Sequence, residues 1–316
     1  MHALKKIGFY TAFILPAITV LGVYLGGWYN YLSPVFVFIV LPVIDQWIGL
    51  DVQNVPAEAV KETEEDWYYR FVTYAWTFVQ VAFILWCVYF ISMQIFSLRE
   101  WIGFILSVGL VTGGIGITVA HELGHKKSTL ERFYSKVLLM TVCYMHFYIE
   151  HNRGHHVTVA TPEDPATARK NQNFYAFWLR SVCMGYVHAW KLEVESLKRK
   201  NLPAFSIHNT LIWYSVLPVL FTSLLMFFGY LLSQQIHWEI AVFFFTQSIV
   251  AFTLLELVNY IEHYGIVRKK LPNGHYERVN PLHSWNASHL LSNFFLFQLQ
   301  RHSDHHAFAH KRYQIL

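Results

Sequence analysis

Nine of the eighteen histidines in this 316-residue chain stand at spacings that suit metal binding. His121 and His125 are four residues apart, so a helix would present both imidazoles on one face, one turn apart. His151 and His155 repeat this spacing, and we expect the adjacent His156 to point about 100° away from their shared face. The nine candidate ligands are His121, His125, His151, His155, His156, His263, His302, His305 and His306.

The residue types predict two metal ions but leave the metal open. Nine imidazoles exceed what one ion of ordinary coordination number needs, and imidazole suits zinc, copper, iron and nickel alike. Structural zinc usually recruits cysteine. The three cysteines, Cys87, Cys143 and Cys183, lie far apart and form no C-x-x-C pair, which excludes a zinc ribbon, an iron–sulfur cluster and a disulfide framework.

Four acidic residues stand beside the histidines and could support them. A carboxylate that accepts the free imidazole N–H fixes the ring's tautomer and strengthens it as a ligand. The alternative for each acid is a solvated side chain next to a basic loop. The candidates for this supporting role are Glu122, Glu150, Glu262 and Asp304, and His146, His283 and His289 are further polar residues near the clusters.

The composition is that of an all-α polytopic membrane protein. It is 54% hydrophobic and only 14% charged, whereas soluble domains are about 25% charged. The apolar residues form runs long enough to cross a bilayer. We expect a single membrane-embedded domain, 1–316, with six spans at about 7–25, 28–50, 71–93, 101–120, 211–233 and 240–260.

The basic residues predict which side of the membrane the histidines face. Cytoplasmic loops collect Lys and Arg, and 23 of the 24 lie in 1–6, 51–70, 121–210 and 261–316, with only Arg99 outside. We therefore expect both termini and all nine histidines on the cytoplasmic side of a bacterial inner membrane. The stretch 135–148 is apolar but too short to span, which favours a re-entrant or buried helix, and 166–204 is typical of cytoplasmic helices. The net charge of +4 is too small and dispersed to indicate nucleic acid.

Several motifs resemble the signature of bacterial alkane 1-monooxygenases, and the likeness covers most of the chain. They are H-E-L-G-H-K at 121–126, E-H-N-R-G-H-H at 150–156, T-P-E-D-P-A at 161–166, N-Y-I-E-H-Y-G at 259–265, H-S-W-N at 283–286 and L-Q-R-H-S-D-H-H-A at 299–307. The resemblance implies two non-haem iron ions held by the nine histidines, O2 as oxidant, and hydroxylation of the terminal methyl group of medium- to long-chain n-alkanes. It also implies electrons from NADH through rubredoxin reductase and rubredoxin. Family members usually continue for several dozen residues more, whereas this chain stops ten residues after His306.

The implied substrate and electron donor make further predictions. An alkane dissolves in bilayer hydrocarbon, so a channel between spans would take it up directly, and the modest side chains of 37–41 would suit a medium to long chain. Rubredoxin must be a separate protein or a domain outside this chain, and a basic patch could steer it. The positive-inside bias is the alternative origin of that patch. The docking candidates are Lys126, Lys127, Arg132, Arg153, Arg301, Lys311 and Arg312.

Two other functions are compatible with a histidine-rich membrane protein. A desaturase or lipid hydroxylase of the same superfamily would share the looser histidine pattern, but the His263 motif and the long motif at 299–307 favour the alkane enzymes. A metal transporter would place ionisable ligands near the bilayer midplane. These histidines stand at span ends instead, and the spans carry few polar residues.

Overall fold

The computed structural model describes residues 6–316, and six of its helical segments are long and apolar enough to cross a membrane. No strand occurs among these residues, which contain only two isolated bridges, Leu50 with His289 and Lys270 with Tyr276. The fold class and the six spans are therefore as the sequence predicted. The spans are Lys6–Leu25, Gly27–Ile48, Trp67–Met93, Leu98–Gly124, Thr210–Ser233 and Glu239–Glu262.

Three of the spans are built from several shorter helical pieces. The first contains η1 (Phe9–Phe13) and α2 (Ile14–Leu25), and the second η2 (Gly27–Tyr31), α3 (Leu32–Val35), η3 (Phe36–Val40) and α4 (Leu41–Ile48). The fourth joins α7 (Leu98–Leu110), η5 (Val111–Ile117) and α8 (Thr118–Gly124). The single-piece spans are α6 (Trp67–Met93), α13 (Thr210–Ser233) and α14 (Glu239–Glu262). Because α8 continues past the predicted end at residue 120, His121 lies inside the fourth span.

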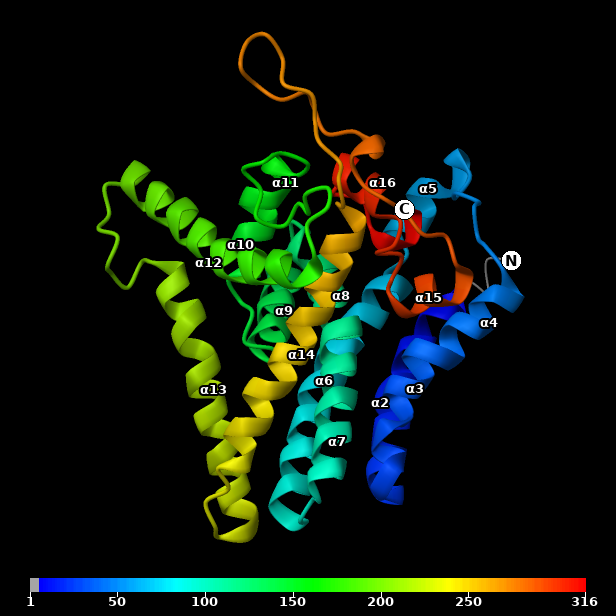
Figure 1. Cartoon of the computed structure of the whole chain (residues 1–316), viewed down its shortest axis with the longest axis vertical. Helices are drawn as coiled ribbons and strands as arrows, with labels where there is room; N and C mark the ends of the chain where they lie inside the picture. The colour runs from blue at the N-terminus through cyan, green and yellow to red at the C-terminus, as the bar shows by residue number, and fades with distance from the viewer. Residues whose placement is uncertain (1–5) are drawn as a thin grey trace.

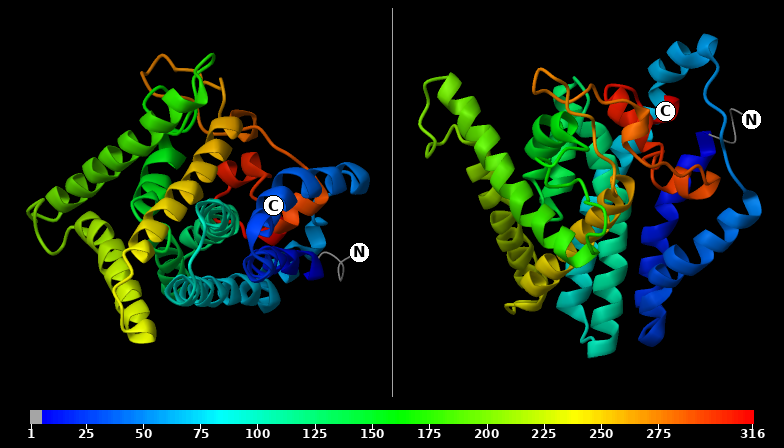
Figure 2. Two further views of the ribbon diagram at one scale, coloured as in Figure 1. Left: turned by 60° about the horizontal axis from the view of Figure 1, so that its bottom comes forward. Right: turned by 45° about the horizontal axis from the view of Figure 1, so that its top comes forward.

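The remaining helices gather at one end of the spans, together with the C-terminus (Figure 1). Figure 2 shows α16 between α14 and the N-terminal helices in both views. The stretch 166–204, expected as several helices, contains one long helix, α12. The bounds are η4 (Ala57–Ala59), α5 (Val60–Glu65), α9 (Thr129–Met140), α10 (Phe147–Glu150), η6 (His151–His155), α11 (His156–Thr158), α12 (Phe174–Arg199), η7 (Pro281–His283), α15 (Leu290–Phe295), α16 (His302–Ala307) and η8 (Tyr313–Ile315).

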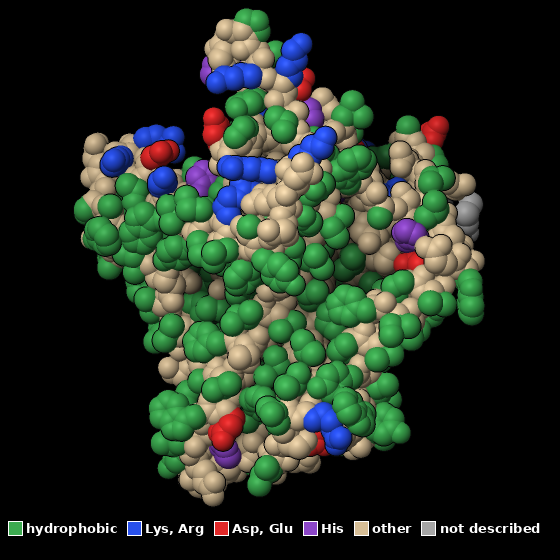
Figure 3. Space-filling view, in the orientation of Figure 1, with side chains coloured by type: hydrophobic (Ala, Val, Ile, Leu, Met, Phe, Trp, Pro, Cys, Tyr) green, Lys and Arg blue, Asp and Glu red, His purple; other side chains and the backbone are tan. Residues whose placement is uncertain are grey.

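The surface is divided in the way a bilayer requires. Apolar side chains cover the middle of the face in Figure 3, and Lys and Arg gather at the end that carries the short helices. At the opposite end the chain turns sharply between the first two spans, where Gly26 and Gly27 both have positive φ, at 68° and 58°. Arg99 lies at this turn, with its guanidinium 4.9 Å from the Trp28 ring.

The fourth and sixth spans, which carry His121 and lead to His263, touch backbone to backbone. A Cβ on Gly113 would lie 2.5 Å from the Ala251 Cα, and one on Gly109 would lie 2.5 Å from the Val250 side chain. Larger residues at these two positions would force α7 and α14 apart. The glycines therefore set the distance between two of the elements that deliver histidines.

Two fully buried glutamines tie the stretch 135–148 into the bundle. Gln80 donates to the Thr141 hydroxyl at 2.7 Å, and Gln247 donates to the Thr141 carbonyl at 2.9 Å. The helix α9 ends at Met140, and turns follow before α10. The stretch is thus a half-helical buried segment, and its non-helical backbone is enclosed by protein as membrane depth demands.

Candidate metal centre

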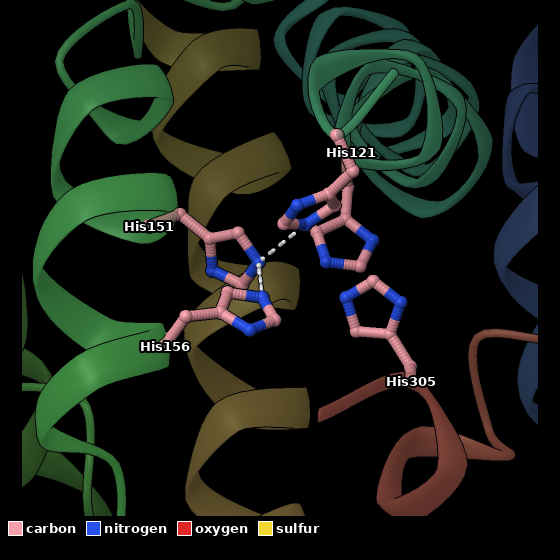
Figure 4. Close-up of side chains that lie close together, drawn as sticks. His121, His151, His156 and His305 are labelled. Carbon is pink, nitrogen blue, oxygen red and sulfur yellow. Dashed lines mark hydrogen bonds between the residues drawn. The ribbon is translucent and has the colours of Figure 1, made fainter. Parts of the chain in front are cut away.

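The nine predicted histidines come together as two groups at one end of the spans. His121, His125, His151, His156 and His305 form a five-histidine group, in which one ring nitrogen of each lies within 4.8 Å of the others. His155, His263, His302 and His306 form a four-histidine group by the same measure. Figure 4 shows His121, His151, His156 and His305 pointing toward one another from separate elements. Both groups consist of histidine alone among the described residues.

Within each group the Nε2 atoms crowd together. The His302–His306 and His302–His263 nitrogens are 2.8 and 3.1 Å apart, and the His151–His156 and His151–His125 nitrogens are 3.0 and 3.1 Å apart. A single Nε2 carries either one proton or one lone pair, so it cannot make good hydrogen bonds with two such neighbours at once. The Nε2 atoms of His121 and His305 are buried without any partner.

This crowding is what metal ligation produces. Imidazoles bound at about 2.1 Å from one ion, at right angles, place their nitrogens about 3 Å apart. The observed spacings match that value, and the orphaned nitrogens of His121 and His305 face the same centre. The residues present therefore fit two metal ions, one in each group.

The second cluster supplies both groups. The rings of His151 and His155 stack with centroids 5.2 Å apart, as expected for a shared face, yet His151 and His156 belong to the five-histidine group and His155 to the four-histidine group. These residues lie in and just after η6 (His151–His155), a π-helical turn whose hydrogen bonds run from i to i+5, so α-helical spacing does not predict how they divide. The i, i+4 expectation holds for His121 with His125 and for His302 with His306, which share their groups.

Burial keeps most of these rings neutral, the state that binds metal. Burial, reinforced by the neighbouring imidazoles, holds the pKa of His125, His151 and His305 well below the usual range, and the same causes act on His302 and His306. Burial also lowers the pKa of His263 to about 3. A protein at neutral pH therefore presents lone pairs to a cation.

His155 differs because a buried carboxylate supports it. Burial opposes its charged form, but Asp164 outweighs burial and raises the pKa of His155. The His155 Nδ1–H donates to Asp164 Oδ2 over 2.9 Å, so the Nε2 lone pair is left to face the four-histidine group. The same Asp164 oxygen accepts from the Thr167 hydroxyl, and the other carboxylate oxygen accepts from the Ala166 N–H. Sequence reasoning missed this role: Asp164 lies in T-P-E-D-P-A, but its nine-residue distance from His155 gave no helical signal.

Of the four carboxylates predicted to support the histidines, only Glu262 faces one of the nine. Its Oε2 lies 3.3 Å from His302 Nδ1. Glu150 faces His188 instead, at 3.2 Å, and Glu122 pairs with Lys126 at 2.9 Å. Asp304 accepts two hydrogen bonds from Lys311. For these three acids the structure gives a different partner from the one we expected.

The other polar residues near the clusters have separate roles. Ser284 in H-S-W-N lies 3.4 Å from His263 Nδ1, and Asn286 exchanges two hydrogen bonds with Ser303 next to His302. His283 accepts from the Asn280 N–H in its own turn. His146 packs on Tyr144, and His289 pairs with Leu50.

Three of the seven predicted docking residues are held inside the protein. Lys126 is 5% exposed, and Arg301 is 8% exposed and donates to the Asp51 and Leu316 carbonyls. Arg312 makes a two-pronged ion pair with buried Glu131. These three side chains are therefore not placed to dock a partner. They hold residues 51–54 and the C-terminal segment against α8, α9 and α16. Lys127, Arg132, Arg153 and Lys311 keep some exposure.

An apolar cavity of about 230 Å³ lies between the spans and leads to the histidines. A small cavity of about 10 Å³ continues from it and touches His121 and His151 of one group and His302 of the other. The first cavity is lined by Leu15, Val37, Phe38, Leu41, Leu110, Gly113, Gly114, Ile115, Ile117, Thr118, Leu254, Leu255, Leu257, Val258, Phe295, Leu296 and Leu299. It thus includes three residues of 37–41, and Phe38 is 57% exposed toward the surface that the bilayer would cover.

Six apolar helices, two all-histidine groups and a cavity that joins them define a multi-pass membrane protein built to hold two metal ions. The sequence model of the family described as "Fatty acid desaturase" matches residues 99–316, which carry all nine histidines.

Curated relatives specify the family further. The chain is 44% identical to Alkane 1-monooxygenase 2 of Pseudomonas aeruginosa, over 100% of this chain and 84% of that protein. It is 42% identical to Alkane 1-monooxygenase 2 of Alcanivorax borkumensis, over 92% and 73%, and 40% identical to Alkane 1-monooxygenase of Pseudomonas putida, over 95% and 74%. The chain therefore belongs to the alkane 1-monooxygenases, within the fatty acid desaturase family, and is an oxidoreductase.

Proposed function

We propose that this protein hydroxylates the terminal methyl group of medium- to long-chain n-alkanes with O2, using two iron ions held by the nine histidines. The observation that carries the proposal is the apolar cavity between the spans, which shares five lining residues with the small cavity that touches His121, His151 and His302. A hydrocarbon could thus approach both histidine groups from the lipid through apolar surroundings. The names of the relatives support alkane as the substrate.

The chain's own residues supply binding, orientation and the exclusion of water. Each CH2 moved out of water gains about 0.8 kcal/mol, but a lipid-dissolved alkane has already gained it, so the cavity needs only to match the bilayer. The space narrows from about 230 Å³ between the spans to about 10 Å³ at the histidines, so side chains there would have to move aside for a chain end, and so narrow an approach favours attack at the terminal carbon. Iron, when bound, would supply the oxidising power that no side chain has. Asp164 would hold His155 in the tautomer that can ligate.

The electrons must come from outside, because the described residues contain no C-x-x-C pair. We propose rubredoxin, reduced by NADH through its reductase, as the donor. Of the docking candidates that keep some exposure, Lys127 is exposed and Arg132, Arg153 and Lys311 are half-buried, and reversing their charge should weaken docking most at low salt. The distribution of Lys and Arg supports a bacterial inner membrane with this end in the cytoplasm.

The first test is metal content and product analysis on one purified sample. We expect close to two irons per chain, and 1-octanol or 1-dodecanol when octane or dodecane is supplied with NADH, rubredoxin and its reductase. Zinc without oxidised product would contradict the proposal, and an olefin in place of the alcohol would favour a desaturase.

A further inference from the structure

A third cavity, of about 150 Å³, adjoins the small cavity at the histidines, with which it shares Val258, Glu262 and Leu299. It lies where α14 ends, between Ile261 and the segment that carries Trp285, Ala287 and Gln300. Ile261 and Trp285 are 58% and 59% exposed. Since the sixth span ends at Glu262, we expect this mouth at the level of the membrane interface, where tryptophan is favoured.

This third cavity is a branch of the same passage. Val258 and Leu299 line all three cavities: the apolar one, the small one at the histidines and the one at the interface. Glu262 lines both the small cavity and the branch. The side chains of Val258 and Leu299 are therefore the partition between them.

The apolar cavity and the branch differ in the hydrogen-bonding groups that they offer to a bound molecule. In the apolar cavity the only polar side chain is that of Thr118, and its hydroxyl already donates to the Gly114 carbonyl at 2.7 Å. In the branch, Gln300 accepts from Ser292 through Oε1, and its NH2 group has no partner among the described residues. Glu262 Oε2 is buried and accepts no hydrogen bond, although it lies 3.3 Å from His302 Nδ1, so it keeps acceptor capacity for a hydroxyl group. A hydroxyl group would therefore find no hydrogen-bond partner in the apolar cavity, but it would find one in the branch.

We infer that this branch is the exit route for the alcohol product, separate from the cavity that holds the alkane. The inference rests on the proposed function, since it assumes that an alcohol forms at the histidines. The new hydroxyl would leave the apolar arm, bond to Glu262 and Gln300 in the branch, and emerge at the interface beside Trp285. The alkyl tail would follow past Val258 and Leu299. The next alkane could then enter from the lipid side without waiting for back-diffusion.

A larger side chain introduced into the branch tests the exit route, and a larger side chain introduced into the apolar cavity is the matched control. Ala287→Phe narrows the branch, and Gly114→Leu narrows the apolar cavity at a position where an added Cβ meets no atom within 4 Å. With dodecane and the complete electron supply, A287F should form the first 1-dodecanol at the wild-type rate. Its later turnovers should be about tenfold slower, because product release becomes limiting. G114L should slow the first turnover and show no burst. Equal slowing of the first and later turnovers in A287F, with wild-type metal content, would overturn the route.

A binding measurement tests the same route without turnover. Gln300→Met keeps the side chain's length but removes its amide. We expect it to weaken binding of radiolabelled 1-dodecanol to the purified full chain about tenfold and to leave dodecane binding unchanged. Equal loss for both ligands, or loss for neither, would overturn the role of Gln300. If the wild type makes no alcohol at all, the proposed function fails, but the difference between the two ligands still decides whether the branch recognises a hydroxyl.

Discussion

Exchanging Asp164 for asparagine should remove the metal ion from one histidine group and spare the other. Asp164 is 0% exposed, and its two oxygens accept from His155, Thr167 and the Ala166 N–H. An asparagine has one acceptor oxygen and one NH2 group. With its oxygen toward the Ala166 N–H, it would donate to His155 Nδ1, which forces the proton onto Nε2 and blocks that ligand.

The size of the effect follows from the burial of the pair. Loss of a hydrogen-bonded partner behind a metal ligand costs 10- to 100-fold in affinity, and a fully buried, charge-assisted contact of 2.9 Å belongs at the upper end. We expect about 100-fold weaker binding at the four-histidine group, or about 2.7 kcal/mol. The five-histidine group contains neither His155 nor a contact with Asp164.

The assay is metal content after equilibration with a chelator of graded strength. The wild-type protein should lose its two ions at similar chelator strength. D164N should retain only one ion per chain at a chelator strength at which the wild type still retains both. Glu163→Gln is the matched control, because Glu163 is the neighbouring acid and is exposed. Two ions retained in D164N with unchanged affinity would refute the tautomer argument.

Three further predictions concern the cavity, the acid response and the internal ties. Gly114→Leu should shift the preferred substrate to shorter alkanes, because the new side chain occupies part of the 230 Å³ cavity; product profiles from octane and hexadecane check this, and an unchanged profile would contradict the assigned channel. Glu193 accepts from Arg153 and from the Thr210 N–H, and despite burial these contacts lower its pKa. The Glu193 carboxylate therefore stabilises the folded protein fully above the unfolded-state pKa, and this contribution is lost as the pH falls through the lowered folded-state pKa. Glu193→Gln should lower stability by about 1 kcal/mol at pH 7 and converge with wild type once the pH is below that folded-state value. Melting curves against pH measure it, and a constant difference at all pH values would refute it. Arg301→Ala should destabilise by about 2–3 kcal/mol by removing the guanidinium's hydrogen bonds to the carbonyls of Asp51 and Leu316, and protease cleavage near 51–54 should appear first. Lys127→Ala, at an exposed position, is its control.

The sequence by itself determined which residues and which helices matter. A run of apolar residues has one stable solution in a bilayer, so the six spans could be placed to within a few residues. The nine histidines were recognisable because they are clustered at short spacings on the side of the spans that carries the basic residues, and helical spacing brings i and i+4 together. The family likeness was visible in the same motifs.

Only the tertiary structure decided which of those residues contact one another and which are buried. The split of His155 from His151 occurs in a π-helical turn, which no spacing rule predicts. Asp164 reaches His155 through a loop, and Lys126 and Arg301 are buried by segments distant in sequence. The cavity beside Glu262 is lined by Val258 of α14 together with Trp285, Ala287 and Leu299, which are distant in sequence. The spacing of residues along the sequence reports the periodicity of a single helix. Side-chain pairing, burial and cavities arise from contacts between helices and loops, and the whole fold sets those contacts.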